Sequence, residues 1–239
     1  MKNTILLLLL LMFAFGHPTK LRAQDNCSDY LLLRENAQYE ILTYSSKDKL
    51  MSRAAYQVKD VSKSGDKIEA TVQSKVYDNK DKLNTEGEFT VGCSNGSIWM
   101  DMRSMVNPDM MEAYKNMEVS MTGDKMLYPS ELKAGQKLED GTLNIEVKDK
   151  SSGQAFSNMT MKITDRTIEG KESIKVPAGT YDAYKISQNT QMENRAMGMR
   201  MPGMRVQTIE YYVPNMGMVR SESYRNGKLM SYSVLSKVK

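Results

Sequence analysis

The feature of the sequence that most restricts its fold is a recurring alternation of apolar and polar side chains. From Ile68 to Val76 every second residue is apolar or small, and the residues between them are mainly polar. The same period of two recurs over residues 159–163, 209–213 and 230–238. Side chains of a β-strand point alternately to the two faces of a sheet, so this pattern is typical of half-buried antiparallel strands. We therefore expect a chain that is mainly β.

Turn signals separate several of these segments. Asn95-Gly96 and Asn226-Gly227 are the strongest of them, because the tightest hairpin turns need positive φ angles that Asn and Gly adopt readily. The sequence therefore predicts hairpins that join residues 89–93 to 98–102, residues 219–224 to 229–234 and, through the turn at residues 64–66, residues 56–62 to 68–76.

One segment has helical rather than strand spacing. Asn107 can cap a helix whose first position is Pro108, and apolar side chains then recur at helical intervals. These side chains are Met110, Ala113, Tyr114, Met117 and Met121. We expect a short helix over residues 108–117. The predicted fold is thus a curved antiparallel sheet or partial barrel packed against one short helix.

The first residues are typical of an export signal. Lys2 precedes an unbroken apolar run over residues 5–15, which is shorter than the roughly 20 apolar residues that a membrane span needs. Ala23 offers a cleavage point, and Gly16 an alternative one. We expect residues 1–23 to be a signal peptide and residues 24–239 a single β-rich domain. That domain should have no transmembrane segment and should be periplasmic or secreted.

Two cysteines, Cys27 and Cys93, remain after removal of the signal peptide. An even number of cysteines in an oxidising compartment favours a disulfide. We therefore predict a bridge between them; two separate buried thiols are the alternative.

The sequence lacks the residues that most enzymes need. Its single histidine, His17, would leave with the signal peptide, which removes histidine-based nucleophilic triads and metal sites. Loss of the basic residues of that peptide also lowers the formal net charge from +4 to about +1, too little for a nucleic-acid binder. We expect no cofactor and no enzymatic activity. A hydrolase that uses paired carboxylates is an alternative, because Asp and Glu are plentiful.

Methionine is unusually frequent, with 21 residues, and is densest over residues 195–205. Glycine and proline interrupt this segment, and it has no β-branched residue, so we predict a loop less ordered than its flanking strands. Its candidate site residues are Met197, Met199, Met201, Met204, Arg195, Arg200 and Arg205.

Three interpretations of this methionine segment stay open. Flexible thioether side chains suit a surface that adapts to apolar ligands, with the arginines as a basic rim. The same four methionines could bind Cu(I), although the arginines would repel a cation. In the third interpretation methionine simply replaces other apolar residues of a core.

Two strings in the C-terminal half carry a family resemblance. Val176-Pro-Ala-Gly-Thr-Tyr181 precedes one expected strand, and Tyr211-Tyr-Val-Pro-Asn-Met-Gly-Met-Val219 spans a strand pair. These strings resemble the TapB-like exported β-rich proteins, a domain-of-unknown-function group of Gram-negative envelopes. The resemblance implies a curved sheet distantly similar in architecture to periplasmic lipoprotein carriers. It implies no catalytic residue.

The function that we expect is that of a non-enzymatic envelope protein. Its partner would be a hydrophobic or lipid-like small molecule, or another envelope protein, bound on the curved sheet. A methionine-based Cu(I)-binding protein and a carboxylate-dependent envelope hydrolase are the alternatives.

Overall fold

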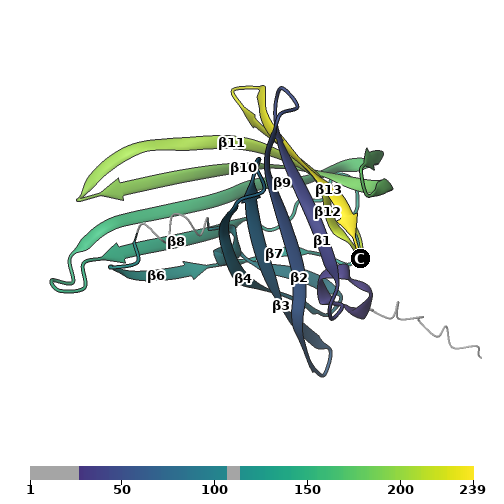
Figure 1. Cartoon of the computed structure of the whole chain (residues 1–239), viewed down its shortest axis with the longest axis horizontal. Coiled ribbons are helices and arrows are strands. Elements are labelled where there is room, and N and C mark those ends of the chain that lie inside the picture. The colour runs from purple at the N-terminus through teal and green to yellow at the C-terminus, as the bar shows by residue number, and fades with distance from the viewer. Residues whose placement is uncertain (1–26, 107–113) are drawn as a thin grey trace, which may run out of the picture.

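The computed structural model describes residues 27–106 and 114–239, and they form one thirteen-stranded antiparallel sheet (Figure 1). The strands are β1 (Gln38–Ser45), β2 (Leu50–Ser64), β3 (Lys67–Asp78), β4 (Leu83–Ser94), β5 (Ser97–Asp101), β6 (Glu118–Gly123), β7 (Lys125–Tyr128), β8 (Gly141–Lys148), β9 (Ala155–Val176), β10 (Gly179–Ala196), β11 (Met199–Val213), β12 (Gly217–Arg225) and β13 (Lys228–Val238). Three short 3-10 segments accompany them: η1 (Cys27–Asp29), η2 (Leu31–Leu33) and η3 (Met102–Met105). The prediction of a mainly β, curved antiparallel fold is confirmed.

The sheet curls until its two edges are joined by the chain itself. Its strand order is β6-β8-β9-β10-β11-β12-β13-β1-β2-β3-β4-β5-β7, and only Asp124 separates the edge strands β6 and β7 in sequence. The Asp124 backbone accepts a hydrogen bond from Met102 N at 3.1 Å and donates one to Thr142 O at 3.0 Å. Its carboxylate accepts a further one from Thr142 N at 2.7 Å. A nearly closed barrel results.

Three strands are much longer than the barrel and carry an arm (Figure 1). We call the outer parts of β9, β10 and β11, together with β8 and β6, the arm. At its upper edge β11 pairs with β12 only from Gln207 to Val213, so residues 199–206 of β11 pair with β10 alone. The arm is therefore a sheet extension with a free edge.

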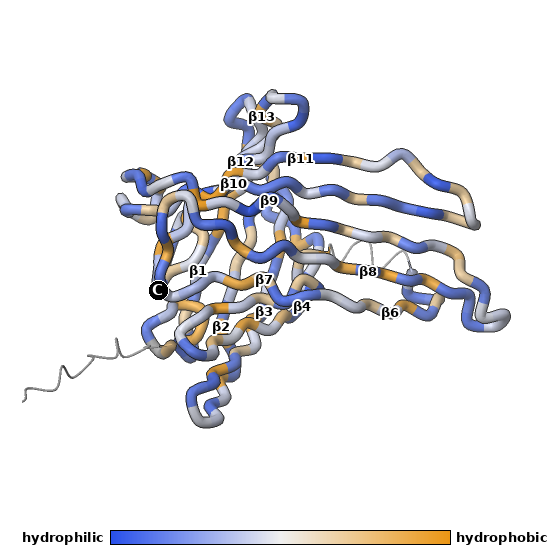
Figure 2. The backbone as a smooth tube through the Cα atoms, turned by 180° about the vertical axis from the view of Figure 1, so that it is seen from behind, coloured by the Kyte–Doolittle hydropathy of each residue, from blue (hydrophilic) through white to orange (hydrophobic). Residues whose placement is uncertain are grey.

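The predicted hairpins form where the turn residues indicated them. Asn95 and Gly96 have φ angles of 49° and 73°, and Asn226 and Gly227 have φ angles of 51° and 72°. Gly65 likewise has a φ of 63° in the turn between β2 and β3. Hydrophilic residues dominate these hairpin tips, whereas apolar residues are concentrated along the strands (Figure 2).

The predicted helix over residues 108–117 falls mainly outside the described residues. Of its members, Tyr114 and the next two residues form a turn, which ends with a hydrogen bond from Met117 N to Tyr114 O at 2.8 Å. Tyr114 and Met117 pack against the core, as the apolar spacing predicted. Among the described residues the helical segments are all of the 3-10 type.

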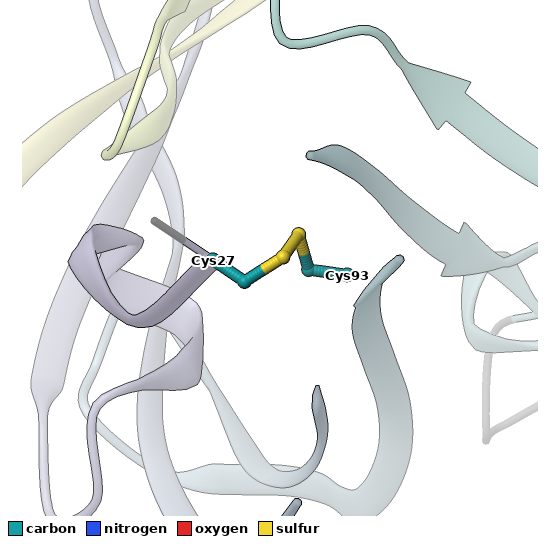
Figure 3. Close-up of a disulfide and its surroundings, with 2 residues drawn as sticks. All are labelled: Cys27 and Cys93. Carbon is teal, nitrogen blue, oxygen red and sulfur yellow. A yellow bond between two sulfur atoms is a disulfide. The ribbon is translucent and has the colours of Figure 1, made fainter. Parts of the chain in front are cut away.

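The predicted disulfide is present between Cys27 and Cys93, whose Cα atoms are 5.6 Å apart (Figure 3). It fixes η1 and η2 against β4, where both cysteines are buried in the interior. Leu31 and Leu33 of η2 are buried in the same core. The first described segment thus covers one end of the barrel.

Candidate functional site

The barrel holds a cavity of about 420 Å³ that is partly open to solvent. Strands β1–β5, β7 and β10–β13 all contribute to its wall, and η2 and η3 add residues at its ends. The apolar part of the wall consists of Leu32, Tyr39, Ile41, Tyr56, Val76, Phe89, Met100, Met105, Val106, Met216, Met218 and Leu235. The size and the lining are those of a small-molecule site, which is typically concave and mostly apolar.

Aromatic rings form one side of this cavity. Tyr39 and Tyr56, from neighbouring strands, stack with centroids 4.5 Å apart, and Phe89 meets Tyr56 edge-on at 6.1 Å. They lie together because they occupy inward positions of β1, β2 and β4. Burial raises the pKa of both tyrosines, so their hydroxyl groups remain protonated and neutral.

A polar cluster of Tyr128, Arg166, Gln188 and Glu210 interrupts the apolar wall on the opposite strands. Arg166 is only 1% exposed. Its Nε donates to Gln188 Oε1 at 3.2 Å, and its Nη1 donates to the backbone oxygens of Leu127 and Glu139 at 3.2 and 2.8 Å. A β-bulge lets this side chain turn inward, because the β9–β10 register shifts beside Asp165, whose φ is 57°.

Glu210 is the carboxyl group of this cluster, it lines the cavity directly, and it is 7% exposed. The hydroxyl group of Tyr128 donates to its two carboxylate oxygens at 3.2 and 3.1 Å. Burial raises the pKa of Glu210, while the charge of Arg166 and the hydrogen bond from Tyr128 act in the opposite direction. The cavity therefore offers a carboxyl group that a bound molecule can contact.

The ring of Tyr128 holds this cluster in place. It stacks on Tyr212 with centroids 4.6 Å apart, and the guanidinium of Arg166 lies 5.0 Å from its centroid. Burial raises the pKa of Tyr128, and the neighbouring Glu210 raises it further. Tyr128 is therefore a permanent hydrogen-bond donor to Glu210.

The solvent-exposed part of the cavity wall carries two charged residues, Glu88 and Arg103. Arg103 forms a bidentate ion pair with Asp101, the residue that caps η3. This hydrogen-bonded pair holds the pKa of Asp101 below its usual value. Since Asp101 already neutralises Arg103, the exposed rim adds little net positive charge to the cavity.

The candidate methionines and arginines lie on the arm and do not line this cavity. The sequence predicted a loop over residues 195–205, and this was wrong: β10 and β11 continue through the segment and meet in a two-residue turn at Met197 and Gly198. These two residues have φ angles of 49° and 78°. Pro202 is tolerated in β11 because it lies in a bulge on the free edge, where its missing N–H is not needed.

The strand register separates the candidate residues by face. Met204 pairs with Met192, Met201 with Asn194 and Met199 with Ala196. Directly paired residues share a face, so these four methionines lie on the face that carries Gln188 and Thr208 of the cavity wall. We call Met192, Met199, Met201 and Met204 the methionine ladder. The candidate arginines Arg195, Arg200 and Arg205 lie on the opposite face, and Met197 is in the turn.

The methionines of this segment are more exposed to solvent than residues of a hydrophobic core are. Met197 and Met199 are 68% and 64% exposed, and Met201 and Met204 are also exposed. A shallow depression of about 200 Å³ brings together Met201, Met204, Arg200 and Arg205. Groups of His, Cys, Asp or Glu that could hold a metal ion are absent from the described residues.

The polar cluster was not found by sequence reasoning. Periodicity selected Ile209, Tyr211 and Val213 as the buried face of β11, yet Glu210 and Tyr212 are buried as well. Both faces of this strand are covered, because Tyr211 and Tyr212, which are adjacent and point to opposite faces, belong to two different hydrophobic clusters. A charged residue inside such a continuous apolar strand is the signal that could have identified Glu210.

The fold and the cavity define the class of the molecule: an exported, β-rich protein, periplasmic or secreted, with a mostly apolar cavity that is partly open to solvent. The chain belongs to the DUF3108-like family, whose model matches residues 34–235. The resemblance to an exported β-rich group of unknown function is thereby confirmed. No curated protein matches the sequence.

Two solved structures share the fold. One is a candidate exported protein with a YmcC-like fold from Bacteroides fragilis, with 27% sequence identity and a TM-score of 0.65; the match covers 86% of this chain and 96% of that chain. The other is a candidate lipoprotein from Parabacteroides distasonis, with 25% identity and a TM-score of 0.69 over 88% of this chain and 98% of that chain. None of the helices in the described part of the chain is long and apolar enough to cross a membrane.

Proposed function

We propose that this protein is a non-enzymatic binding protein of the cell envelope that holds a hydrophobic or lipid-like ligand inside the barrel. The observation that carries the proposal is the cavity of about 420 Å³, whose wall is mostly apolar and includes one buried polar cluster. Such a wall favours an apolar body by its area and orients the ligand through few polar contacts. Residues 1–23 would act as the signal peptide that delivers the chain, leaving one β-rich domain.

The geometry favours binding over hydrolysis. A carboxylate-pair mechanism needs two carboxyl groups that flank the bond to be cleaved. Among the described residues that line the cavity, the carboxyl groups are those of Glu210 and Glu88, and Glu88 is exposed to solvent. The buried Glu210 is held by Tyr128 instead of facing a second acid.

The methionine ladder extends the same surface beyond the barrel. Along β10 and β11 the inward positions run from Gln188 and Thr208 through Thr190 and Val206 to Met192 and Met204. A ligand chain that leaves the cavity on this face would therefore meet thioether side chains, which adapt to different shapes. We propose that the ladder is the outer part of the ligand path, and that the arginines on the other face keep the arm soluble.

The proposal is tested by blocking the cavity. Val76 faces the cavity from β3, whereas its neighbour Lys75 lies on the other face of the strand. Val76→Trp should weaken binding of the neutral fluorescent probe N-phenyl-1-naphthylamine by about tenfold or more, the effect of losing roughly 55 Å² of apolar contact at about 25 cal/mol per Å². The control Lys75→Trp should bind like wild type. Equal binding by wild type and both variants would place the probe elsewhere and contradict the proposal.

A second set of variants tests the four exposed methionines of the arm, three of which belong to the ladder, and separates ligand binding from copper binding. Replacing Met197, Met199, Met201 and Met204 together by leucine should preserve probe binding, because leucine keeps the apolar volume, and serine should weaken it. A Cu(I) site would behave differently, since only the thioether coordinates the metal. If wild type binds Cu(I), and the leucine variant loses this binding as fully as the serine variant does, the copper function is favoured.

A further inference from the structure

The carboxyl group of Glu210 is the best placed group in the cavity to recognise the polar end of a ligand. It comes from the middle of the wall, between Thr208 and Tyr212 on the inward face of β11, and the cavity reaches it directly. A carboxylate has about four acceptor positions. Among the described residues the hydrogen bonds to these oxygens both come from one hydroxyl group, that of Tyr128. Acceptor positions are therefore left for a bound molecule.

Arg166 does not fill those positions. Its Nε and Nη1 are directed to the side chain of Gln188 and to two backbone oxygens, and no ion pair between Arg166 and Glu210 is present in the described structure within 4.0 Å. Arg166 also does not line the cavity, whereas Glu210 does. A ligand in the cavity can thus contact the acceptor Glu210 directly. The positive charge of Arg166 can act on the ligand only through the residues of the wall.

The rings and the charges of the rest of the wall also favour a cationic ligand group. The rings of Tyr39, Tyr56 and Phe89 lie in the same cavity, and the faces of aromatic rings attract cations. At the rim, Arg103 is already paired with Asp101, while Glu88 adds a negative charge. Arg166 keeps one buried nitrogen, Nη2, without a hydrogen-bond partner among the described residues, but Arg166 does not line the cavity. An anionic ligand group in the cavity would be buried beside Glu210, which is costly.

We propose that Glu210 selects the polar end of the ligand, so that the cavity takes a single apolar chain ending in a hydrogen-bond donor, an amine before an alcohol, and discriminates against a carboxylate end. This inference rests on the proposed function and specifies its ligand class. An ammonium group supplies three donors and a charge complementary to Glu210, and a hydroxyl group supplies one donor without charge. A carboxylate supplies neither, and places two like charges side by side.

The test compares three probes with the same chain: dodecylamine, dodecanol and dodecanoate. Each displaces N-phenyl-1-naphthylamine from the wild-type protein at pH 7, below the concentration at which it forms micelles. Dodecylamine should bind most tightly, and dodecanoate at least about tenfold more weakly than dodecylamine, since like-charge juxtaposition costs several kcal/mol. In Glu210→Gln, which keeps the side-chain volume and an acceptor for Tyr128, this preference should disappear.

Controls separate the outcomes. Glu88→Gln removes the other carboxylate of the cavity wall, which lies at the solvent-exposed rim, and should reduce the preference much less than Glu210→Gln does. Thermal unfolding shows whether each variant is folded. If no probe binds to wild type, the proposed function itself is wrong. If all three bind equally well, or dodecanoate binds best, the cavity is a binding site but Glu210 does not select the ligand. A preference that persists in a folded Glu210→Gln variant also overturns the inference. If that variant does not fold, the order in which wild type binds the three probes decides whether the inference holds.

Discussion

At Gly92 the side chain of Trp99 leaves room for a hydrogen atom but not for a larger side chain. Gly92 pairs with Trp99 across β4 and β5, and the indole lies over it. A Cβ atom added at Gly92 would be 2.3 Å from Cζ2 of Trp99 and 2.4 Å from Cε2. On its other side Trp99 is covered by Lys125, whose Nζ is 3.3 Å from the ring centroid. The indole is therefore held from two directions.

Gly92→Ala should destabilise the protein by about 1–3 kcal/mol, the usual cost of overpacking a buried site. Trp99 is the only tryptophan of the chain, so urea unfolding followed by its fluorescence measures the effect at the site itself. Gly170→Ala is the matched control, because a Cβ atom there meets nothing within 4 Å; it should change the stability by less than about 0.5 kcal/mol. Equal stability of the two variants would contradict this account of Gly92.

Asp149 shows how a single carboxylate orders a turn. In the connection from β8 to β9 its Oδ1 accepts hydrogen bonds from the backbone amides of Ser151 and Ser152 at 3.0 and 2.8 Å, and from their hydroxyl groups. These bonds favour the charged form and lower its pKa to about 2. A lowered pKa means that the stabilising contribution is present above the ordinary Asp value of 3.8 and is lost as the pH falls towards 2.

The variant Asp149→Asn should therefore unfold at a lower temperature than wild type at pH 6, and the difference should shrink as the pH approaches 2. Thermal unfolding of both proteins across this range gives the comparison, since all other carboxyl groups are shared. A difference that stays constant from pH 6 to pH 2 would show that the charge of Asp149 does not stabilise the turn.

At the scale of elements, the disulfide is what fastens η1 and η2 to the sheet. These segments are only three residues each, too short to be stable by themselves. Leu31 N donates to Asn215 O at 2.8 Å, and the bridge to Cys93 closes a loop with a sequence separation of 66. The cover over this end of the barrel thus depends on one covalent bond and a few buried leucines.

Replacing Cys27 and Cys93 together by alanine should lower the free energy of unfolding by about 4 kcal/mol, because a loop of this length then regains its freedom in the unfolded chain. Urea unfolding of wild type and variant measures the loss. Reductant should lower the stability of wild type towards that of the variant and leave the variant unchanged. A loss below about 1 kcal/mol would mean that η1 and η2 are held by packing alone.

The elements also show what the sequence could predict. The hairpins at Asn95 and Asn226 were predictable because the turn is decided by the two residues that form it. The turn at Met197 and Gly198 was not, because β10 is extended up to Ala196 by its pairing with β9, a contact that the residues of the turn do not encode. The same holds for the candidate site: composition pointed to the exposed methionines of the arm, whereas Glu210 and Arg166 are brought to one wall by a bulge and by the closure of the barrel.

For the whole molecule, Asp124 is the point at which the sheet becomes nearly closed. The edge strands β6 and β7 bond to β8 and β5 respectively, and Asp124 between them is bonded to Thr142 through both backbone and side chain. No local pattern predicts this closure, because the two edges are defined by strands from opposite ends of the sheet order.

Asp124→Ala should cost about 1 kcal/mol, the contribution of a hydrogen bond to the Thr142 amide, and should act mainly on that edge. Hydrogen exchange followed by NMR should show a faster rate at the Thr142 amide, while amides in the pairing of β11 with β12 keep their wild-type rates. Faster exchange throughout the sheet would instead show that the whole barrel opens when this one contact is lost.

The position of β1 has a consequence for the order in which the protein can form. The first strand in sequence occupies the middle of the sheet, between β2 and β13, the last strand. Tyr39 pairs with Val238, and Ser45 with Ser231. Contacts between residues so far apart in sequence form late, after the long loop between them has closed. A chain that emerges N-terminus first from a translocation channel therefore cannot form the pair of β1 with β13, and so cannot complete its sheet, until its final residues have passed.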